Sequence, residues 1–261
     1  MLNITPIITT DAPANNSLKP TFQFAAQLLS ANLRNWKALA LTLGMPFFML
    51  FSFWLPSLDG DEESKQLMQL LFPAIILLSV IMPGLTQATR LTRWREQRIF
   101  QRFALTPVPL ANLMLGTAFT QILIGIGQGL LMLMFGVLLV KFNLSALHML
   151  AVLGTMMLAG AAFIAFGSLI AAFCRKSDIA GYVFFFSIMP LIFLASFPPE
   201  MLPASINAVT PWLPTSMAIE IIGPLFLFAR FSDGALLAAV GLVAYTALFT
   251  LLSMRLFHWK A

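Results

Sequence analysis

Charged side chains are scarce in this sequence of 261 residues: only 10% are Asp, Glu, Lys or Arg, whereas 59% are hydrophobic. Soluble domains are nearer half apolar and a quarter charged. The shortage of charge, together with 25 Phe and 15 Met, excludes an ordinary soluble enzyme and a disordered chain. The composition predicts an integral membrane protein in which one membrane domain accounts for nearly the whole length.

Cysteine and histidine are almost missing as well, which limits the chemistry. The single cysteine, Cys174, lies beside Arg175 and Lys176, and we expect a reduced, inert thiol. The two histidines, His148 and His258, have no Cys or carboxylate cluster around them, so no metal site is expected. The sequence also lacks a G-x-x-x-x-G-K-[ST] phosphate loop and a G-x-S-x-G motif. We therefore expect a non-catalytic chain that binds no cofactor of its own.

Six apolar segments are long enough to cross a bilayer, which takes about 20 mostly apolar residues. They cover roughly residues 38–55, 67–88, 110–140, 147–173, 179–197 and 235–257. Prolines inside these segments are compatible with membrane helices because neighbouring helices satisfy the carbonyls that they free. The expected fold class is an all-α integral membrane protein with six transmembrane helices.

The net charge of +5 is distributed in a way that predicts topology and excludes nucleic-acid binding. Nucleic-acid-binding domains gather basic residues on a water-facing surface, whereas here they fall in the short gaps between apolar segments. If the N-terminus is cytoplasmic, twelve of the 15 Lys and Arg residues lie inside, and only Lys65, Lys141 and Arg230 lie outside. Cytoplasmic loops carry the excess of basic residues. Both termini are therefore expected in the cytoplasm.

The first 36 residues differ from the predicted spans. Residues 1–20 are rich in Thr, Asn, Pro and Ser, and we expect a flexible cytoplasmic tail. In residues 21–36, a spacing of three or four places five apolar residues on one helical face: Phe22, Ala25, Leu29, Leu33 and Trp36. This pattern favours a helix lying in the membrane interface, and a first turn of the following span is the alternative. Residues 37–261 then form the six-span domain.

The loop between the second and third spans, residues 90–109, predicts an amphipathic helix. One face carries Arg95, Arg98 and Arg102, and the other carries Ile99, Phe100 and Phe103 with Glu96 among them. A positive-inside loop would explain the arginines alone. The apolar face, which ends at Thr106-Pro107, indicates a helix that docks on headgroups or on another protein. Glu96 would then pair with a basic or donor-rich partner surface, because an unpaired carboxylate is costly in an apolar contact.

The inner loop before the fifth span, residues 174–178, contains two possible helix caps. The side chains of Ser177 and Asp178 can both accept hydrogen bonds from the free N–H groups at a helix start. We expect one of them to cap the fifth span.

Between the fifth and sixth spans, residues 197–230 stay apolar but contain several prolines and no clean span. This pattern predicts two short helices that dip back into the outer leaflet. Glu200 and Glu220 would then lie near membrane depth, where an ionised side chain is costly and usually functional. The alternative, in which both carboxylates reach the outer surface, stays open.

These two unusual stretches resemble the ABC-2 type family of ABC transporter permeases, in its drug-exporter-like branch. Between spans two and three that family carries a pattern close to R-E-x-G-T-L-E-x-L-x-x-T-P. Glu96, Thr106 and Pro107 match this pattern, and Phe100 and Phe103 keep its apolar positions. Three residues depart from the family's Gly, Thr and Glu: Arg98, Ile99 and Gln101.

The outer stretch is similar to the same family's F-P-x-E-x-L-P, followed by P-L-T-x-x-x-E. The matching residues are Phe197, Pro198, Glu200, Leu202, Pro203, Pro214, Ser216 and Glu220. Thr215 stands in place of the family's Leu. Together with the six spans and the N-terminal helix, the resemblance covers nearly the whole chain.

The resemblance implies an exporter subunit in a bacterial-type cytoplasmic (inner) membrane. It would pair with a second permease protomer, identical or a paralogue, and bind two cytoplasmic ABC ATPase subunits, which hold ATP and Mg. The segment 95–103, with Thr106 and Pro107, would be the ATPase-coupling helix, and the outer hairpin would shape the exit gate. A hydrophobic or amphipathic substrate (a drug, lipid or peptide) would pass along spans one, two and five.

Three other functions fit the sequence less well. The polysaccharide- or glycolipid-exporting branch usually carries a basic, Tyr-Arg-rich motif before span one, where residues 30–41 here read SANLRNWKALAL. A secondary transporter or channel would place charges within its spans, and spans one to four contain almost none. A membrane assembly factor would show no nucleotide-dependent change with an ATPase.

Overall fold

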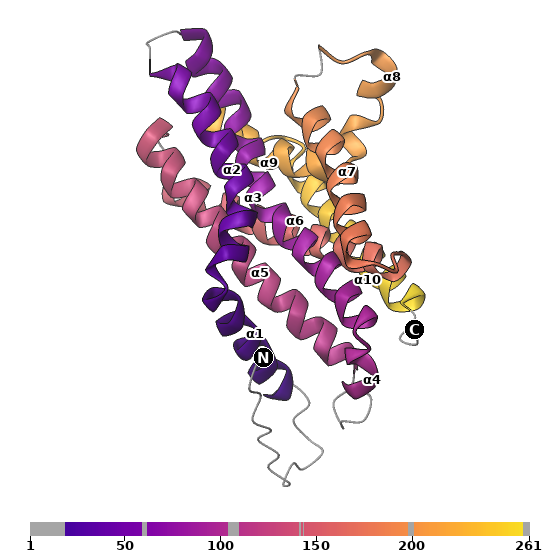
Figure 1. Cartoon of the computed structure of the whole chain (residues 1–261). Helices are drawn as coiled ribbons and strands as arrows, with labels where there is room; N and C mark the ends of the chain where they lie inside the picture. The colour runs from indigo at the N-terminus through magenta and orange to yellow at the C-terminus, as the bar shows by residue number, and fades with distance from the viewer. Residues whose placement is uncertain are drawn as a thin grey trace.

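The computed structural model describes residues 19–58, 62–103, 110–140, 142, 144–197 and 201–257. Every regular element in these ranges is helical, which confirms the expected all-α class (Figure 1). In chain order the elements are α1 (Lys19–Arg34), α2 (Trp36–Ser57), α3 (Glu62–Glu96), α4 (Ile99–Phe103), α5 (Leu110–Phe135), the π-helix η1 (Gly136–Val140), α6 (Ala146–Phe173), α7 (Ser177–Ser196), α8 (Ala204–Asn207), the 3-10 helix η3 (Thr210–Trp212), α9 (Pro214–Phe228) and α10 (Ala235–Leu256).

Each of the six predicted spans corresponds to a helix. Five helices in the described ranges are long and apolar enough to cross a membrane, namely α3, α5 with η1, α6, α7 and α10. The apolar stretch of α2, Thr42–Ser57, is shorter. The whole of α2 nevertheless has 22 residues, and at 1.5 Å per residue it is about 33 Å long, enough for a hydrocarbon core of about 30 Å.

Helix α3 forms the centre of the bundle. It has 35 residues and runs well past the predicted end of the second span. It packs against α2, α5, α6, α7 and α9, and Phe72, Ile76 and Ile81 on it are fully buried. Helix α3 therefore contacts most of the other helices in the described part of the chain.

Two glycines allow α3 and α6 to cross at backbone contact distance. A Cβ atom at Gly167 would lie 2.2 Å from the carbonyl oxygen of Gly84. A Cβ atom at Gly84 would lie 2.6 Å from the carbonyl oxygen of Phe163. Small residues promote this kind of close approach between membrane helices. Beside the crossing, Gln87 Nε2 donates to Thr117 Oγ1 and to Ser168 Oγ, both at 3.2 Å. These bonds join α3 to α5 and α6.

The segment between α7 and α10 contains the predicted pair of short helical pieces. The piece Ala204–Trp212 and helix α9 are bent by 83° relative to each other. Thr215 Oγ1 at the start of α9 donates to Leu191 O of α7 at 3.0 Å, and Tyr245 Oη of α10 donates to Trp212 O at 2.8 Å. The bent pair is therefore fixed to α7 and α10 by side-chain hydrogen bonds.

Helix α1 packs against α5, where Thr120 Oγ1 donates to the carbonyl oxygen of Ala25 at 3.2 Å. Ala25 is buried, but Leu33 and Trp36 are 59% and 67% exposed. The predicted apolar face is thus divided: its early part packs on the bundle and its later part faces outward. The predicted tail, residues 1–20, lies almost wholly outside the described residues.

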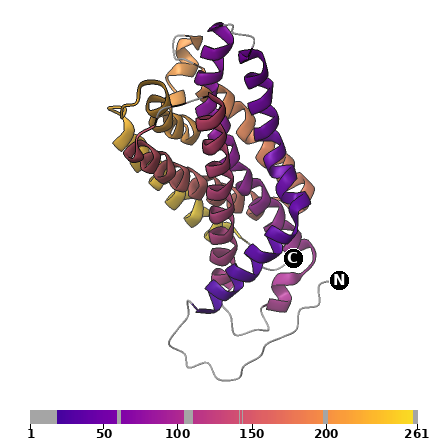
Figure 2. The same ribbon diagram turned by 90° about the vertical axis from the view of Figure 1, so that its left-hand side faces the viewer.

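The start of α1, the end of α10 and helix α4 lie toward the same end of the molecule (Figures 1 and 2). Helix α8, the end of α2 and the start of α3 lie toward the opposite end (Figure 1). We call the first the basic end, after the residues in its helix ends and connections: Arg93, Arg95, Arg98, Arg175, Lys176 and Arg255. The candidate functional site is at this end.

Candidate functional site

The predicted amphipathic helix Arg95–Phe103 is not continuous in the structure. Helix α3 ends at Glu96, and α4 begins at Ile99. Between them Arg98 adopts a left-handed conformation with φ 52°, which is uncommon for any residue other than glycine. The prediction of one helix with Arg95, Arg98 and Arg102 on a common face is therefore wrong. We call residues 95–100 the α3–α4 junction.

Arg95 of the junction binds the end of α6. Its Nη1 donates to Ala172 O at 3.3 Å, and its Nη2 donates to Cys174 O. The guanidinium also lies 5.4 Å from the centre of the Phe257 ring, just after α10. The last carbonyls of a helix have no partner within the helix, and a cation is favourable there. Arg95 therefore caps α6 and contacts the end of α10.

Glu96 binds the start of α7. Its Oε1 accepts from the backbone N–H of Ser177 at 3.0 Å. The N-cap position of α7 is Lys176, which makes no side-chain cap hydrogen bond. The expectation that Ser177 or Asp178 caps this helix is thus wrong, because α3 supplies the carboxylate. An anion at a helix start is favoured by the helix dipole. Glu96 was predicted to pair with a partner surface. Its Oε1 instead accepts a hydrogen bond within the chain.

Phe100 is turned into the bundle. It is 2% exposed, and its ring lies 6.0 Å from Trp94 and 5.6 Å from Phe257 in edge-to-face contacts. The apolar face that contains Phe100 was predicted to dock on headgroups or on another protein, but after the left-handed turn at Arg98 the Phe100 side chain packs within its own chain. Ile99 is half-buried. The side chains of Arg102 and Phe103, with Thr106 and Pro107, lie outside the part of the structure that is described.

The α3–α4 junction therefore joins the ends of α3, α6, α7 and α10 with the short helix α4. Two adjacent side chains of α3 bind the end of α6 and the start of α7, and the aromatic cluster adds α4 and the end of α10. Within the described residues, no group of three or more His, Cys, Asp or Glu is placed to hold a metal ion. The junction thus places α4 in contact with the ends of several longer helices.

The outer motif residues that the structure describes are spread along the segment between α7 and α10. Phe197 packs on Phe193 with ring centres 4.6 Å apart, Pro203 precedes α8, and buried Pro214 opens α9. Leu202 and Ser216 are half-buried. Pro198 and Glu200 lie outside the described residues. Glu220 is exposed and accepts from Ser232 Oγ beyond the end of α9. Its carboxylate is thus partnered and at the surface.

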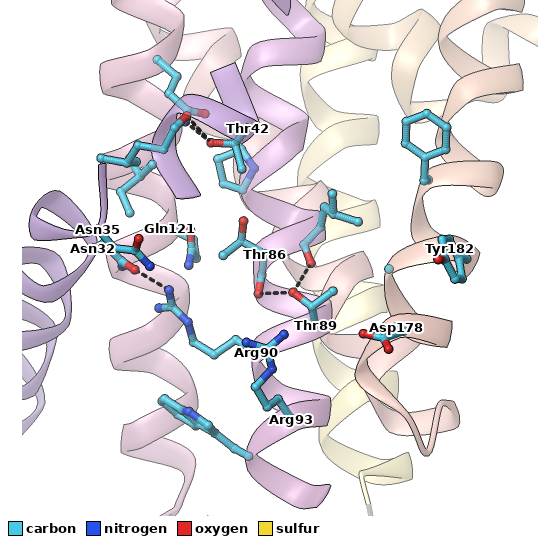
Figure 3. A pocket seen from close by; sticks show the side chains of 18 of the residues that line it. Asn32, Asn35, Thr42, Thr86, Thr89, Arg90, Arg93, Gln121, Asp178 and Tyr182 are labelled. Atoms are coloured by element: carbon cyan, nitrogen blue, oxygen red, sulfur yellow. Dashed lines mark hydrogen bonds between the residues drawn. The ribbon is translucent and has the colours of Figure 1, made fainter. Parts of the chain in front are cut away.

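A cavity of about 780 Å³ opens beside the junction, between α1, α2, α3, α5 and α7 (Figure 3). Its polar lining residues are Asn32, Asn35, Thr42, Thr86, Thr89, Arg90, Arg93, Gln121, Gln128, Asp178 and Tyr182. Arg90 Nη2 donates to Asn32 Oδ1 across the cavity wall, which joins α3 to α1. No sequence pattern predicted this cavity. The one sign of it in the sequence is the presence of Gln and Thr within apolar spans.

The long apolar helices define a multi-pass membrane protein. A family model described as ABC-2 type transporter matches residues 22–227. The chain therefore belongs to the ABC-2 type transporter family, and it is a permease subunit that associates with an ABC ATPase in a membrane. A search of curated proteins found no match.

The left-handed turn gives a first prediction. The family pattern has Gly at the position of Arg98, and a side chain in this conformation costs about 1 kcal/mol. We therefore expect Arg98→Gly to raise the free energy of unfolding by about 1 kcal/mol, measured by thermal unfolding in detergent. Arg98→Ala removes the same charge but keeps the Cβ, so it should not stabilise. Equal stabilisation by both variants would show that charge repulsion, and not backbone strain, dominates at this position.

Proposed function

We propose that the chain is an exporter permease that works as a dimer with two ABC ATPase subunits and moves a hydrophobic or amphipathic compound outward. The observation that carries the proposal is the α3–α4 junction, where Arg95 and Glu96 join α3 to α6 and α7. The family match supports the permease role. The ATPase subunits would dock at the basic end, on α4 and the residues that follow it.

The junction suggests how ATP binding would drive transport. Closure of the two ATPase subunits would displace α4. Because the junction binds α6, α7 and α10, those helix ends would shift together with α3. ATP shifts an equilibrium between inward-open and outward-open states only if it binds the complex more tightly in one state than in the other. The bent pair at the opposite end, with Glu200 and Glu220, would act as the exit gate.

The proposal is tested by co-expressing the chain with candidate ABC ATPase subunits. We expect a stable complex whose reconstitution in proteoliposomes gives ATP-dependent movement of an amphipathic dye. The control is the same complex with the phosphate-loop Lys of the ATPase replaced by Ala. A chain that binds no ATPase subunit, or a complex that moves dye equally with the inactive ATPase, would contradict the proposal.

The proposed orientation places the basic end in the cytoplasm, in a bacterial-type inner membrane, and cysteine labelling tests it. Burial raises the pKa of the Cys174 thiol, which the nearby Arg95 partly opposes, so the native thiol should react slowly at neutral pH. In a Cys174→Ser background, cysteines at positions 62 and 232 should react with a membrane-impermeant maleimide from outside. A cysteine at position 98 should react only after the membrane is opened. Labelling of position 98 in intact cells would overturn the topology.

A further inference from the structure

The cavity beside the junction contains hydrogen-bond donors that lack partners. Three nitrogen atoms are fully buried and make no hydrogen bond within the described residues: Asn32 Nδ2, Arg90 Nη1 and Gln121 Nε2. They come from α1, α3 and α5, and all three residues line the same cavity (Figure 3). The Gln121 side chain is only 1% exposed. One buried acceptor of the lining, Gln128 Oε1, also lacks a partner, so donors outnumber acceptors three to one. A buried donor without a partner is costly, and the convergence of three indicates a ligand that mainly accepts hydrogen bonds.

The donor character of two of these groups is fixed by chemistry. Arginine has N–H donors and no acceptor. Arg90 Nη2 already donates to Asn32 Oδ1, and this bond sets the orientation of the Asn32 amide. Asn32 Nδ2 is therefore left as a donor, as is the second Arg90 nitrogen. A guanidinium beside amide donors is the arrangement that carboxylates and phosphates prefer.

The charge of the lining also favours an anion. Two arginines, Arg90 and Arg93, and one carboxylate, Asp178, line the cavity. Among the described residues Asp178 forms no ion pair with either arginine. The lining therefore keeps an excess of positive charge on the α3 side.

The size and apolar walls of the cavity fit a molecule larger than an inorganic ion. Its volume of about 780 Å³ is within the range of sites for drug-sized ligands. Its walls include Leu39, Pro83, Phe185 and Phe186, and Phe186 is 70% exposed on the bundle surface. One side of the cavity thus continues onto an apolar surface that suits an alkyl or aromatic tail.

We propose that this cavity binds the anionic group, a phosphate or a carboxylate, of an amphipathic molecule. Arg90, Asn32 and Gln121 hold the anion, and the tail lies along Phe185 and Phe186. This inference rests on the proposed function in one respect: if the chain exports amphipathic compounds, those with an anionic headgroup are the substrate class. Arg90 is the central residue, since it offers a charge and a free N–H and also positions Asn32.

Binding is tested in neutral detergent with a purified chain in which the other four tryptophans are replaced by Phe, so that the fluorescence is that of Trp94, which lines the cavity. The probes are decyl phosphate, decyl glucoside as its neutral counterpart, and inorganic phosphate. We expect decyl phosphate to bind about tenfold more tightly than decyl glucoside, the size expected for one charge-assisted contact. Arg90→Gln and Gln121→Leu should each remove most of this preference. Arg255→Gln, at an exposed arginine of the same basic end, should retain it.

Each outcome decides the proposal. Equal binding of both decyl compounds, or an unchanged preference in both Arg90→Gln and Gln121→Leu, would overturn it, and Gln121→Leu still decides if Arg90→Gln fails to fold. Competition by inorganic phosphate at the same concentration would assign the site to a free anion and overturn the amphipathic ligand. The measurement uses no ATPase, so its failure is separate from failure of the proposed transport. Binding without ATP-driven export of decyl phosphate would overturn the substrate class alone.

Discussion

Gly167→Ala is expected to destabilise the folded protein strongly, although it adds only one methyl group. The new Cβ would lie 2.2 Å from the Gly84 carbonyl oxygen, so the backbones of α3 and α6 would have to separate. Over-packing of this kind costs about 1–3 kcal/mol, and we expect the upper part of that range because the neighbour is backbone and cannot change rotamer. The expected observation is a large fall in the unfolding temperature in detergent and a low yield of monodisperse protein.

Gly154→Ala is the matched control, because Gly154 is in the same helix and a Cβ there meets nothing within 4 Å. Alanine is the better helix former by about 1 kcal/mol, so this variant should be neutral or slightly stabilised. If Gly167→Ala were as stable as Gly154→Ala, the close crossing of α3 and α6 would be contradicted.

Arg95→Ala is expected to have the largest effect on transport. It removes both hydrogen bonds to the end of α6 and the contact with Phe257. Hydrogen bonds to a charged group contribute about 1.5–3 kcal/mol, so we expect roughly tenfold or greater loss of ATP-driven transport in proteoliposomes. ATP hydrolysis by the partner subunit should continue, because the substitution weakens the contact between α3 and α6 and leaves the ATPase subunit unchanged.

The control for Arg95→Ala is Arg255→Ala, which removes an exposed positive charge at the same end of the bundle. That variant should transport at the wild-type rate. Arg95→Lys keeps the charge but lacks the planar fork of arginine, and it should fall between wild type and Arg95→Ala. An equal loss in Arg95→Ala and Arg255→Ala would mean that net charge, and not the cap on α6, governs coupling.

The spans were predictable from the sequence because a bilayer requires long apolar helices, and each predicted segment has its helix in the structure. The end of α3 was harder to predict. The hydropathy falls near residue 88, but the helix continues to Glu96 because Leu91 and Thr92 remain buried against the bundle. Hydropathy reports where lipid ends, whereas helix length also depends on packing beyond that point.

The junction was misread because a helical wheel assumes one continuous helix. The left-handed residue Arg98 breaks that continuity, so residues on either side of it no longer share a face. The family's Gly at this position was the one sign of a turn. Phe100, which follows this turn, faces inward.

The close crossing and the cavity depend on contacts between residues far apart in the sequence. Gly84 and Gly167 meet only because α3 and α6 cross at that point. Asn32, Arg90 and Gln121 come from three helices, and no spacing within one segment relates them. Periodicity identifies faces of single helices, whereas these features depend on how the helices are arranged.

The proposed mechanism requires that the ATPase subunit docks at the α3–α4 junction. It also requires that the ATPase subunit moves this junction. The most direct measurement is cross-linking from a cysteine at position 98, in a Cys174→Ser background, to the co-expressed ATPase subunit in native membranes. We expect a cross-link at position 98 whose yield changes when the ATPase is trapped with ATP and vanadate, and none from a cysteine at position 62. A cross-link from position 62, or none from position 98 in an assembled complex, would contradict the mechanism.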